Sequence, residues 1–272
     1  MPFSCLPASL YPEISRGERT LADWFNLAAD LDLDGADISV AHLDSLDDAY
    51  LDELRQQAHD AGVVIAGMVT YTDFTHPDPA ERRRHRHELR QYIDAAARLE
   101  VDFLRVTAGQ NHPGVALADG IAWAADGLSA WVDEASAAGV TLAYENHAIG
   151  YVWSYFDFSQ KASVFLEICA RTAHSGLKLL FDTANLIAVN DDPLAVLDQV
   201  LPRVAALHVS DIRRVGAFEP VLIGSGVTPL HQIFERFRSA GFDGWVSVEE
   251  ASKTGDDGFR RAIEYTRELW LD

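Results

Sequence analysis

Four short apolar segments of this chain end in side chains that could bind a metal ion or transfer a proton. The segment at 141–147, "TLAYENH", ends with Glu145, Asn146 and His147, although nothing before Glu145 in it is charged. The segments "LKLLFDT", "VAALHVSD" and "GWVSVEE" carry Asp182, His208 and Glu249 near their ends. A carboxylate is costly to bury unless it is paired or bound to a cation, so four such endings need an explanation.

The residues two positions earlier indicate which way these side chains point. Side chains alternate along a strand, so residues i and i−2 share a face. These earlier residues are mostly small, as expected for an inward-facing layer beneath a site: Ala143, Leu180, Ala206 and Ser247. If the four segments are neighbouring parallel strands, they direct Glu, Asp, His and Glu into one space.

Three carboxylates in one space repel each other unless protons or a cation hold them together. A divalent ion relieves that repulsion, and a mixed oxygen and nitrogen ligand set suits Mn²⁺, Mg²⁺, Co²⁺ or Zn²⁺. The alternative is that each residue is an isolated polar group satisfied by a neighbour in its own loop. Because four consecutive strands end in the same way, the pattern favours a metal site.

The strands and helices that must position these residues are expected to alternate regularly along the chain. Apolar runs alternate with amphipathic segments of helical spacing such as "LDELRQQAHDAG", several of which close with Gly, a residue typical of helix C-termini. This alternation predicts a single (β/α)8 TIM barrel formed by one domain over residues 1–272, in which active sites lie at the C-terminal ends of the strands. A doubly wound open sheet is the alternative, but no phosphate-binding glycine loop follows the first strand. The eight predicted strands are 3–9, 35–42, 63–70, 101–109, 141–147, 177–183, 204–211 and 244–250.

The composition of the chain limits which kinds of partner it is expected to bind. The chain has 22 Lys and Arg against 42 Asp and Glu, a net charge of −20, which repels phosphate backbones and argues against nucleic acid. The basic run at 81–90, "ERRRHRHELR", is expected to be the exposed face of a helix. No segment approaches the roughly 20 apolar residues of a membrane span. Two cysteines and a start without signal-peptide character predict a cytoplasmic protein without membrane partners.

The motifs "LAYENH", "LLFDTAN", "LHVSDIR", "LIGSGVTPL" and "GWVSVEE" carry a family resemblance. With them the chain resembles the sugar phosphate isomerase/epimerase family, whose fold is the xylose isomerase-like TIM barrel, although residues 1–100 match only loosely. The resemblance implies that Glu145, Asp182, His208 and Glu249 bind one divalent ion, with Mn²⁺ favoured. It is also compatible with a homo-oligomer, because dimers and tetramers are common in the family.

The resemblance also implies a reaction. An α-hydroxy ketone that chelates a metal has an acidified C–H bond, because the ion stabilises the enediolate. Proton transfer then requires a base on one side and an acid on the other. In epimerases of this family two metal-bound glutamates act in this way, so Glu145 and Glu249 are the expected catalytic pair.

Four further residues are candidates for contact with a carbohydrate substrate. Arg214 stands six residues after His208, where epimerase relatives have a substrate-binding arginine. Asn185 replaces a histidine found in relatives. His147 is expected beside the metal site or the substrate, and Arg105 is expected to face inward, where a buried guanidinium needs a carboxylate. The aromatic stretch 151–158, "YVWSYFDF", could cover a sugar ring or simply pack, and the "LIGSGVTPL" glycines are expected to be turn residues.

Three functions compete on this basis. The first is a sugar isomerase or epimerase acting on a ketose or related polyol. The second is a dehydratase of a keto-inositol or keto-sugar acid, in which the same enediolate expels a hydroxyl group. The third, a remote alternative, is the activity of an apurinic endonuclease-like enzyme. The zinc site of that enzyme needs further histidines, including one at the position of Asn185. The net charge of this chain also opposes DNA binding.

Overall fold

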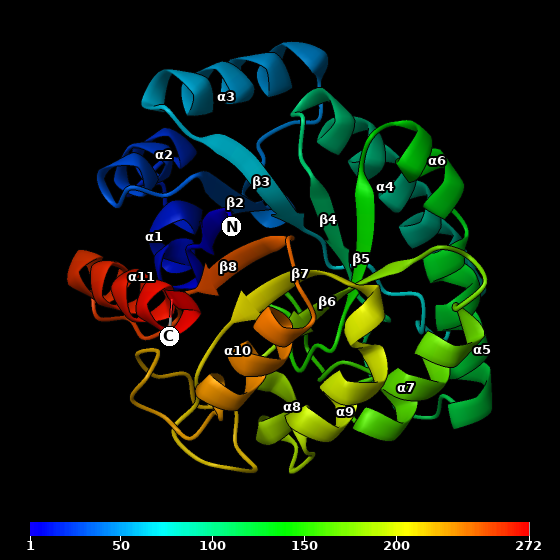
Figure 1. The fold of residues 1–272 in the computed structure, drawn as a ribbon. Helices are drawn as coiled ribbons and strands as arrows, with labels where there is room; N and C mark the ends of the chain where they lie inside the picture. Colours follow the sequence, from blue (N-terminus) through cyan, green and yellow to red (C-terminus); the bar gives the residue numbers. More distant parts are fainter. Residues whose placement is uncertain (272) are drawn as a thin grey trace.

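A ring of eight parallel strands forms the centre of the molecule, and helices surround it (Figure 1). This computed structural model describes residues 1–271. The hydrogen-bonded order is β1-β8-β7-β6-β5-β4-β3-β2, so neighbours in sequence are neighbours in space. The strands are β1 Phe3–Leu6, β2 Gly35–Ser39, β3 Val64–Val69, β4 Phe103–Val106, β5 Thr141–Glu145, β6 Lys178–Asp182, β7 Val204–Val209 and β8 Trp245–Glu249.

The ring is nearly closed where β1 meets β2. Hydrogen bonds join the start of β1 to the turn before β2, from the backbone N–H of Asp34 to the carbonyl oxygen of Phe3 (3.0 Å) and from the Phe3 N–H to Asp34 Oδ2 (2.8 Å). The architecture confirms the predicted (β/α)8 barrel. The doubly wound alternative is wrong, because such a sheet reverses its strand order at a switch point and this one does not.

The helices lie outside the strands and begin and end with recognisable signals. Thr20 and Asp23 form a reciprocal capping box at the start of α2, and Gly62 ends α3 with a φ of 90°, a conformation that glycine adopts at low cost. The α-helices are α1 Tyr11–Ser15, α2 Leu21–Asp30, α3 Asp48–Ala61, α4 Pro79–Arg98, α5 Leu117–Ser129, α6 Val132–Ala137, α7 Ala162–Arg171, α8 Asn185–Ala188, α9 Pro193–Val200, α10 Leu230–Ser239 and α11 Asp256–Leu271. Three short 3₁₀ helices are η1 Ala8–Leu10, η2 Val40–His42 and η3 Leu201–Arg203.

Two apolar regions hold the barrel together. A large cluster fills the space between strands and helices, and a small cluster fills the interior of the ring. The small cluster contains Ala143, Leu180 and Ala206, three of the residues predicted to face inward below the site, together with Ala66 and Phe103. Gly67 lets the ring of Phe103 lie across β3, since a Cβ atom there would stand 2.2 Å from that ring.

Within residues 1–271, each helix is too short or too polar to cross a lipid bilayer.

Candidate metal centre

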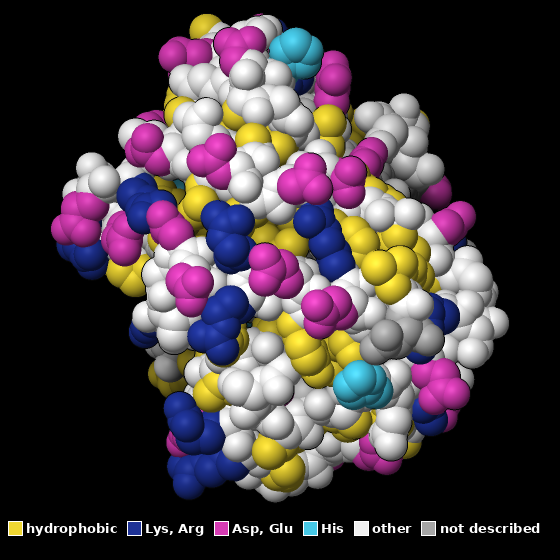
Figure 2. All heavy atoms as spheres, turned by 60° about the vertical axis from the view of Figure 1, so that its left-hand side comes forward, with side chains coloured by type: hydrophobic (Ala, Val, Ile, Leu, Met, Phe, Trp, Pro, Cys, Tyr) yellow, Lys and Arg dark blue, Asp and Glu magenta, His cyan; other side chains and the backbone are white. Residues whose placement is uncertain are grey.

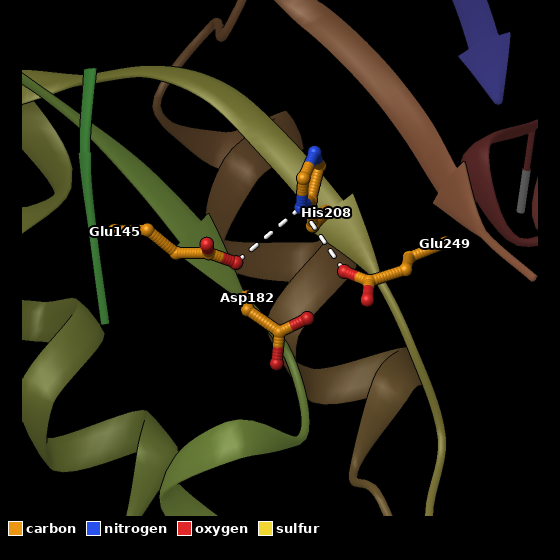
Figure 3. Close-up of side chains that lie close together, drawn as sticks. All are labelled: Glu145, Asp182, His208 and Glu249. Carbon is orange, nitrogen blue, oxygen red and sulfur yellow. Dashed lines mark ion pairs between the residues drawn. The ribbon is translucent and has the colours of Figure 1, made fainter. Parts of the chain in front are cut away.

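Glu145, Asp182, His208 and Glu249 converge at the C-terminal mouth of the barrel (Figure 3). Glu145, Asp182 and Glu249 are the last residues of β5, β6 and β8, and His208 is the last but one of β7. Each offers a ligand atom such that these atoms all lie within 4.8 Å of one another. The four side chains expected to meet are therefore brought together by the alternation of side chains on neighbouring strands.

His208 lies between the two glutamates. Its Nδ1 atom is 3.3 Å from Glu145 Oε1 and 3.1 Å from Glu249 Oε2, and Figure 3 shows Glu145 and Glu249 on opposite sides of the ring. Burial lowers the pKa of His208, but its contacts with Glu145 and Glu249 outweigh burial and raise the pKa to about 10. In the absence of a metal ion, the imidazolium is thus the cation between the carboxylates.

Arg105 stabilises the charge on Glu145. This arginine projects from β4 with only 4% of its side chain exposed, and its Nε atom lies 3.1 Å from Glu145 Oε2. A second nitrogen, Nη1, donates to the carbonyl oxygen of Thr70 (2.7 Å). Burial raises the pKa of Glu145, but the charge of Arg105 and the contact with His208 prevail and lower it to about 2. Arg105 therefore has the carboxylate partner that its buried position requires.

Asp182 has a different environment. Its Oδ1 atom accepts backbone N–H bonds from Ala184 (2.9 Å) and Asn185 (2.7 Å), and its Oδ2 atom accepts from the Ser210 hydroxyl (2.7 Å). Burial, followed by the negative charges of Glu249 and Glu145, raises the pKa of Asp182 to about 8. In the metal-free cluster, Asp182 is thus the carboxyl group that keeps a proton near neutral pH.

The donor atoms fit a divalent cation. Both carboxylate oxygens of Glu145 and both ring nitrogens of His208 are buried without a hydrogen-bond partner among the described residues. Buried polar atoms are rarely left in this state, and a cation bound by three carboxylates and one imidazole would satisfy Nδ1 of His208 and the Glu145 oxygen nearest to it. Such a mixed ligand set is compatible with Mn²⁺, Mg²⁺, Co²⁺ or Zn²⁺.

Asn146 joins the ends of two of these strands. Its Nδ2 atom donates to the carbonyl oxygen of Asp182 (2.9 Å), and its Oδ1 atom accepts from the Asp182 N–H (2.8 Å). This pair of hydrogen bonds extends the link between β5 and β6 beyond their last paired residues, Glu145 and Leu180. The polar residue after Glu145 thereby holds Asp182 in position beside it.

His147 lies next to the cluster and pairs with an aspartate from the following loop. Its Nδ1 atom is 3.3 Å from Asp157 Oδ2, and its ring packs edge-on against Trp153 at 5.4 Å between centroids. Asp157 is fully buried, and its Oδ1 atom accepts from both the N–H and the hydroxyl of Ser159 (2.7 Å each). His147 is therefore held in one orientation at the edge of the metal centre.

Asn185 and Arg214 lie in different surroundings. Asn185 is the first residue of α8, and with Asp182, Ser210 and Glu249 it lines a small cavity to which Phe218 from the loop after β7 also contributes. Arg214 stands on that loop with 67% of its side chain exposed, and its Nη2 atom bonds to Glu219 (2.6 Å). The structure thus places Asn185 at the cluster and pairs Arg214 with a surface carboxylate.

The histidines after β3 and β4 form a separate group. His112 Nε2 lies 2.7 Å from Asp73 Oδ2, and the rings of His112 and His76 are 4.7 Å apart. Within the part of the chain that the structure describes, the cluster around Glu145 is the only group of potential ligands close enough to hold an ion. Asp73 is the partner of His112, and His76 Nδ1 accepts the N–H of Asp78 (3.1 Å).

The loop carrying "LIGSGVTPL" wraps around a carboxylate of the protein itself. Asp211 Oδ2 accepts the N–H groups of Gly224 (3.0 Å) and Gly226 (2.7 Å), and its Oδ1 atom accepts the N–H of Thr228 (3.1 Å). A Cβ atom on Gly226 would stand 2.2 Å from Asp211 Oδ1. These glycines are therefore turn residues that let the backbone approach Asp211.

The aromatic stretch after β5 packs against loops on the far side of the mouth. Tyr151 packs edge-on against Tyr11 (5.1 Å between centroids), and its hydroxyl lies 3.1 Å from Ser15 Oγ. Trp153 contacts Tyr71, which follows β3, with 6.5 Å between centroids. The segment therefore reaches from the end of β5 toward the loops after β1 and β3.

Several residues around the cluster were not singled out from the sequence. Ser210 could have been found from its position two residues after His208, on the same face of the chain. Asp37 could have been found because it is a charged residue in the middle of an apolar strand. Asp157 gives no local signal, because only the course of its loop brings it to His147.

Comparison with known proteins agrees with this geometry. The sequence profile of the xylose isomerase-like TIM barrel family matches residues 25–269. The chain therefore belongs to that family, and the resemblance inferred from its motifs is confirmed.

Among characterised sequences, inosose dehydratase of Lacticaseibacillus casei is 26% identical over 141 residues, and the match covers 46% of this chain and 45% of that protein. The chain thus matches less than half the length of that relative. A putative hydroxypyruvate isomerase of Streptomyces coelicolor is 26% identical over 217 residues, with 76% of this chain and 75% of that protein covered.

Two solved structures show the same fold. A D-psicose 3-epimerase determined in the presence of D-fructose superposes with a TM-score of 0.79 and 17% identity over 100% of both chains. The IOLI protein with a bound zinc atom has a TM-score of 0.76 and 17% identity, covering 100% of this chain and 97% of that one. At these identities the likeness concerns the fold.

Proposed function

We propose that this protein is a divalent-metal-dependent sugar isomerase or epimerase that acts on a ketose or related polyol through an enediolate. The observation that carries the proposal is the convergence of four ligand atoms within 4.8 Å at the mouth of the barrel. Three carboxylates at that spacing need protons or a cation among them to offset their repulsion, and the charges of Glu249 and Glu145 contribute to the raised pKa of Asp182.

Glu145, Asp182, His208 and Glu249 would hold the ion, with Mn²⁺ as the first choice. A bound divalent ion supplies Lewis-acid stabilisation of negative charge on the substrate oxygens. The same residues also fix the place of the substrate, because the open side of the cluster faces the loops after the strands. Asn185, which lines the small cavity beside Asp182 and Glu249, and His147, two residues after Glu145, would contact substrate hydroxyl groups.

Glu145 and Glu249 are the proposed acid and base. They come from strands on either side of His208, so a substrate above the cluster would have one carboxylate toward each face (Figure 3). One glutamate would take the proton from the carbon next to the carbonyl group, and the other would return a proton to the opposite face. Arg105 keeps Glu145 ionised, and it would also orient that carboxylate.

Glu145 and Glu249 differ in exposure, and this difference suggests which of them removes the proton and which returns one. The Glu145 side chain is 1% exposed and paired with Arg105, whereas that of Glu249 is 25% exposed. A carboxylate that is paired and strongly acidic is a weak base. Glu249 is therefore the better candidate for removing the proton. Glu145, which Arg105 keeps ionised, would take up a proton from water and return it to the opposite face.

A dehydratase of a keto-inositol or keto-sugar acid is the second candidate. The observation in its favour is the similarity to inosose dehydratase, which is 26% identical to this chain over 141 aligned residues. The two reactions share the first proton transfer and differ in the next step. After removal of the proton, the isomerase returns a proton to carbon, whereas the dehydratase expels a neighbouring hydroxyl group as water.

The experiment that separates them is NMR spectroscopy in D₂O. Metal-loaded protein would be incubated with a panel of ketoses, keto-inositols and sugar acids, and the products observed over time. Deuterium incorporated at the carbon next to the carbonyl group without loss of water supports the isomerase or epimerase. A dehydrated product identifies the dehydratase, and the absence of both exchange and product with every compound contradicts the proposed reaction class.

A further inference from the structure

The second ring nitrogen of His208 is buried and faces away from the carboxylates. Figure 3 shows Nδ1 directed at Glu145 and Glu249, with the other nitrogen on the opposite side of the ring. This Nε2 atom has no hydrogen-bond partner among residues 1–271, and His208 is 0% exposed. A histidine that binds a metal nearly always donates its other N–H to a carboxylate, a carbonyl group or water.

A second buried carboxylate lies inside the barrel and is hydrogen-bonded to Ser247, the residue paired with His208 on the neighbouring strand. Asp37 is in the middle of β2 and is fully buried, a costly position for an acidic residue without a role. Its Oδ2 atom accepts a hydrogen bond from the Ser247 hydroxyl at 2.5 Å. Its Oδ1 atom, like Nε2 of His208, has no partner in the described part of the chain.

The register of the strands brings Asp37 and His208 together. Ser247 on β8 is paired with His208 on β7, and it is also paired with Ser4 on β1. Paired residues on neighbouring strands project to the same face about 4.8 Å apart. Asp37, on β2, therefore accepts a hydrogen bond from Ser247, and the Ser247 side chain stands directly beside that of His208 inside the barrel.

Electrostatics agree with this placement. Burial raises the pKa of Asp37, and the positive charge of His208 is the largest effect that opposes it. The hydrogen bond from Ser247 also lowers the pKa of Asp37. The ring of His208 is thus within electrostatic reach of the Asp37 carboxylate.

We propose that Asp37 is a positioning residue for metal binding: its carboxylate accepts the Nε2 proton of His208, directly or through one water molecule. This inference rests on the proposed metal centre. A neutral imidazole carries one proton, so fixing it on Nε2 leaves the lone pair of Nδ1 free for the ion. Asp37 also holds the ring in the plane that aims Nδ1 between Glu145 and Glu249.

Asp37→Asn tests the proposal because it keeps the size of the side chain and removes its charge. The apparent dissociation constant for Zn²⁺ would be measured by competition with a chromophoric chelator at constant pH. We expect binding to weaken about 10–100-fold, the usual cost of losing such a partner. Asp73→Asn is the matched control, because it neutralises another buried carboxylate that pairs with His112.

The outcomes separate this inference from the proposed function. Failure of the wild-type protein to bind Zn²⁺ removes the metal centre itself. Wild-type binding with unchanged affinity in folded Asp37→Asn overturns the role of Asp37 alone. An equal loss in Asp73→Asn also overturns it, since the effect would then follow from neutralising any buried carboxylate.

A measurement on the wild-type protein keeps the proposal testable if Asp37→Asn does not fold. Selective ¹⁵N labelling of histidine in the Zn²⁺-loaded protein reports the tautomer of His208. We expect Nε2 to carry a proton that exchanges slowly with solvent, because a buried carboxylate holds it. An unprotonated Nε2, or one whose proton exchanges as fast as that of an exposed histidine such as His59, overturns the proposal.

Discussion

At the scale of single residues, the four ligand side chains differ in how strongly their substitution should weaken metal binding. Asp182 is held by three hydrogen bonds and His208 by its two glutamate neighbours, so both are fixed before an ion binds. Asp182→Ala and His208→Ala should each lose most of a stoichiometry of about one ion per chain. Elemental analysis of loaded and desalted protein measures this, and a wild-type protein without stoichiometric metal would falsify the metal centre.

Glu145→Gln and Glu249→Gln should affect turnover more than metal content. Glutamine keeps one oxygen ligand and the size of the side chain but cannot accept the proton. Groups of this kind contribute about 10²–10⁴-fold to rate, so a loss in that range is expected once a substrate is found. Glu167→Gln, which changes an exposed carboxylate paired with Arg171 on α7, is the control.

The outcomes for these two variants assign the roles. A variant that still exchanges the substrate proton with D₂O but forms no product retains the first proton transfer and lacks the second. Near-normal turnover in either variant contradicts its assigned role and points to His147 instead. A parallel loss of metal and activity would show the glutamate only as a metal ligand.

Protons and metal ions should compete for the cluster. The pKa of Asp182 is about 8 and that of His208 about 10 in the metal-free protein, so both groups hold protons that an ion must displace. Both values lie above the unfolded values of about 3.9 and 6.5. The stability that they contribute is therefore fully present below the unfolded pKa and is lost as the pH rises through the folded one.

The metal-free protein should accordingly lose thermal stability between about pH 4, where the Asp182 contribution begins to fall, and pH 10, and metal-loaded protein should lose less in the upper part of this range. The difference in Tm between loaded and EDTA-treated samples should widen as the pH rises through this range. Asp182→Ala should show little difference at any pH, because it cannot hold the ion. A difference in wild-type Tm that stays constant from pH 6 to 10 would contradict the assigned protonation states.

At the scale of elements, the loop between β7 and α10 depends on one carboxylate. Asp211 accepts hydrogen bonds from the N–H groups of Gly224, Gly226 and Thr228, and Phe218 of the same loop lines the small cavity beside Asn185. The position of this loop therefore determines the shape of one side of the proposed substrate site.

Asp211→Ala should release the loop. Removing the acceptor leaves several N–H groups without a partner, and we expect unfolding free energy to fall by about 1–3 kcal/mol. Trypsin should cleave faster after Arg213 and Arg214, which lie in this loop. Asp198→Ala, at an exposed carboxylate that pairs with Arg236, is the control, and equal cleavage rates in the two variants would show that Asp211 does not hold the loop.

At the scale of the whole molecule, charge decides which partners can approach. The net charge is −20, and on the face drawn in Figure 2 acidic side chains are interspersed with the basic ones. The basic run in α4 is neutralised by neighbours, since Arg84 pairs with Glu81, Arg86 with Asp126 and Arg90 with Glu134. These ion pairs agree with the expectation that the run is an exposed helix face.

The protein should therefore show no salt-sensitive binding to duplex DNA and no cleavage at abasic sites. Fluorescence anisotropy with a labelled duplex, across a series of salt concentrations, measures the binding. An abasic-site oligonucleotide and metal-loaded protein test the cleavage. Incision at physiological salt would reverse the ranking of the candidate functions in favour of the endonuclease.

The sequence alone determined the strands, their order and the four proposed ligands. These follow from local rules: hydrophobic periodicity places the strands, and alternation of side chains places Glu145, Asp182, His208 and Glu249 on the inner face. Short-range rules suffice here because a parallel barrel brings every strand's C-terminal end to the same mouth.

Only the tertiary structure decided which partners surround those ligands. Ser247 and Asp37 are 210 residues apart, and their hydrogen bond exists because the ring brings β2 close to β8. The pairing of His147 with Asp157 and of His112 with Asp73 depends on the paths of loops that have no periodic pattern. A side chain's direction is a local property of the strand, whereas its partner depends on how the whole ring closes.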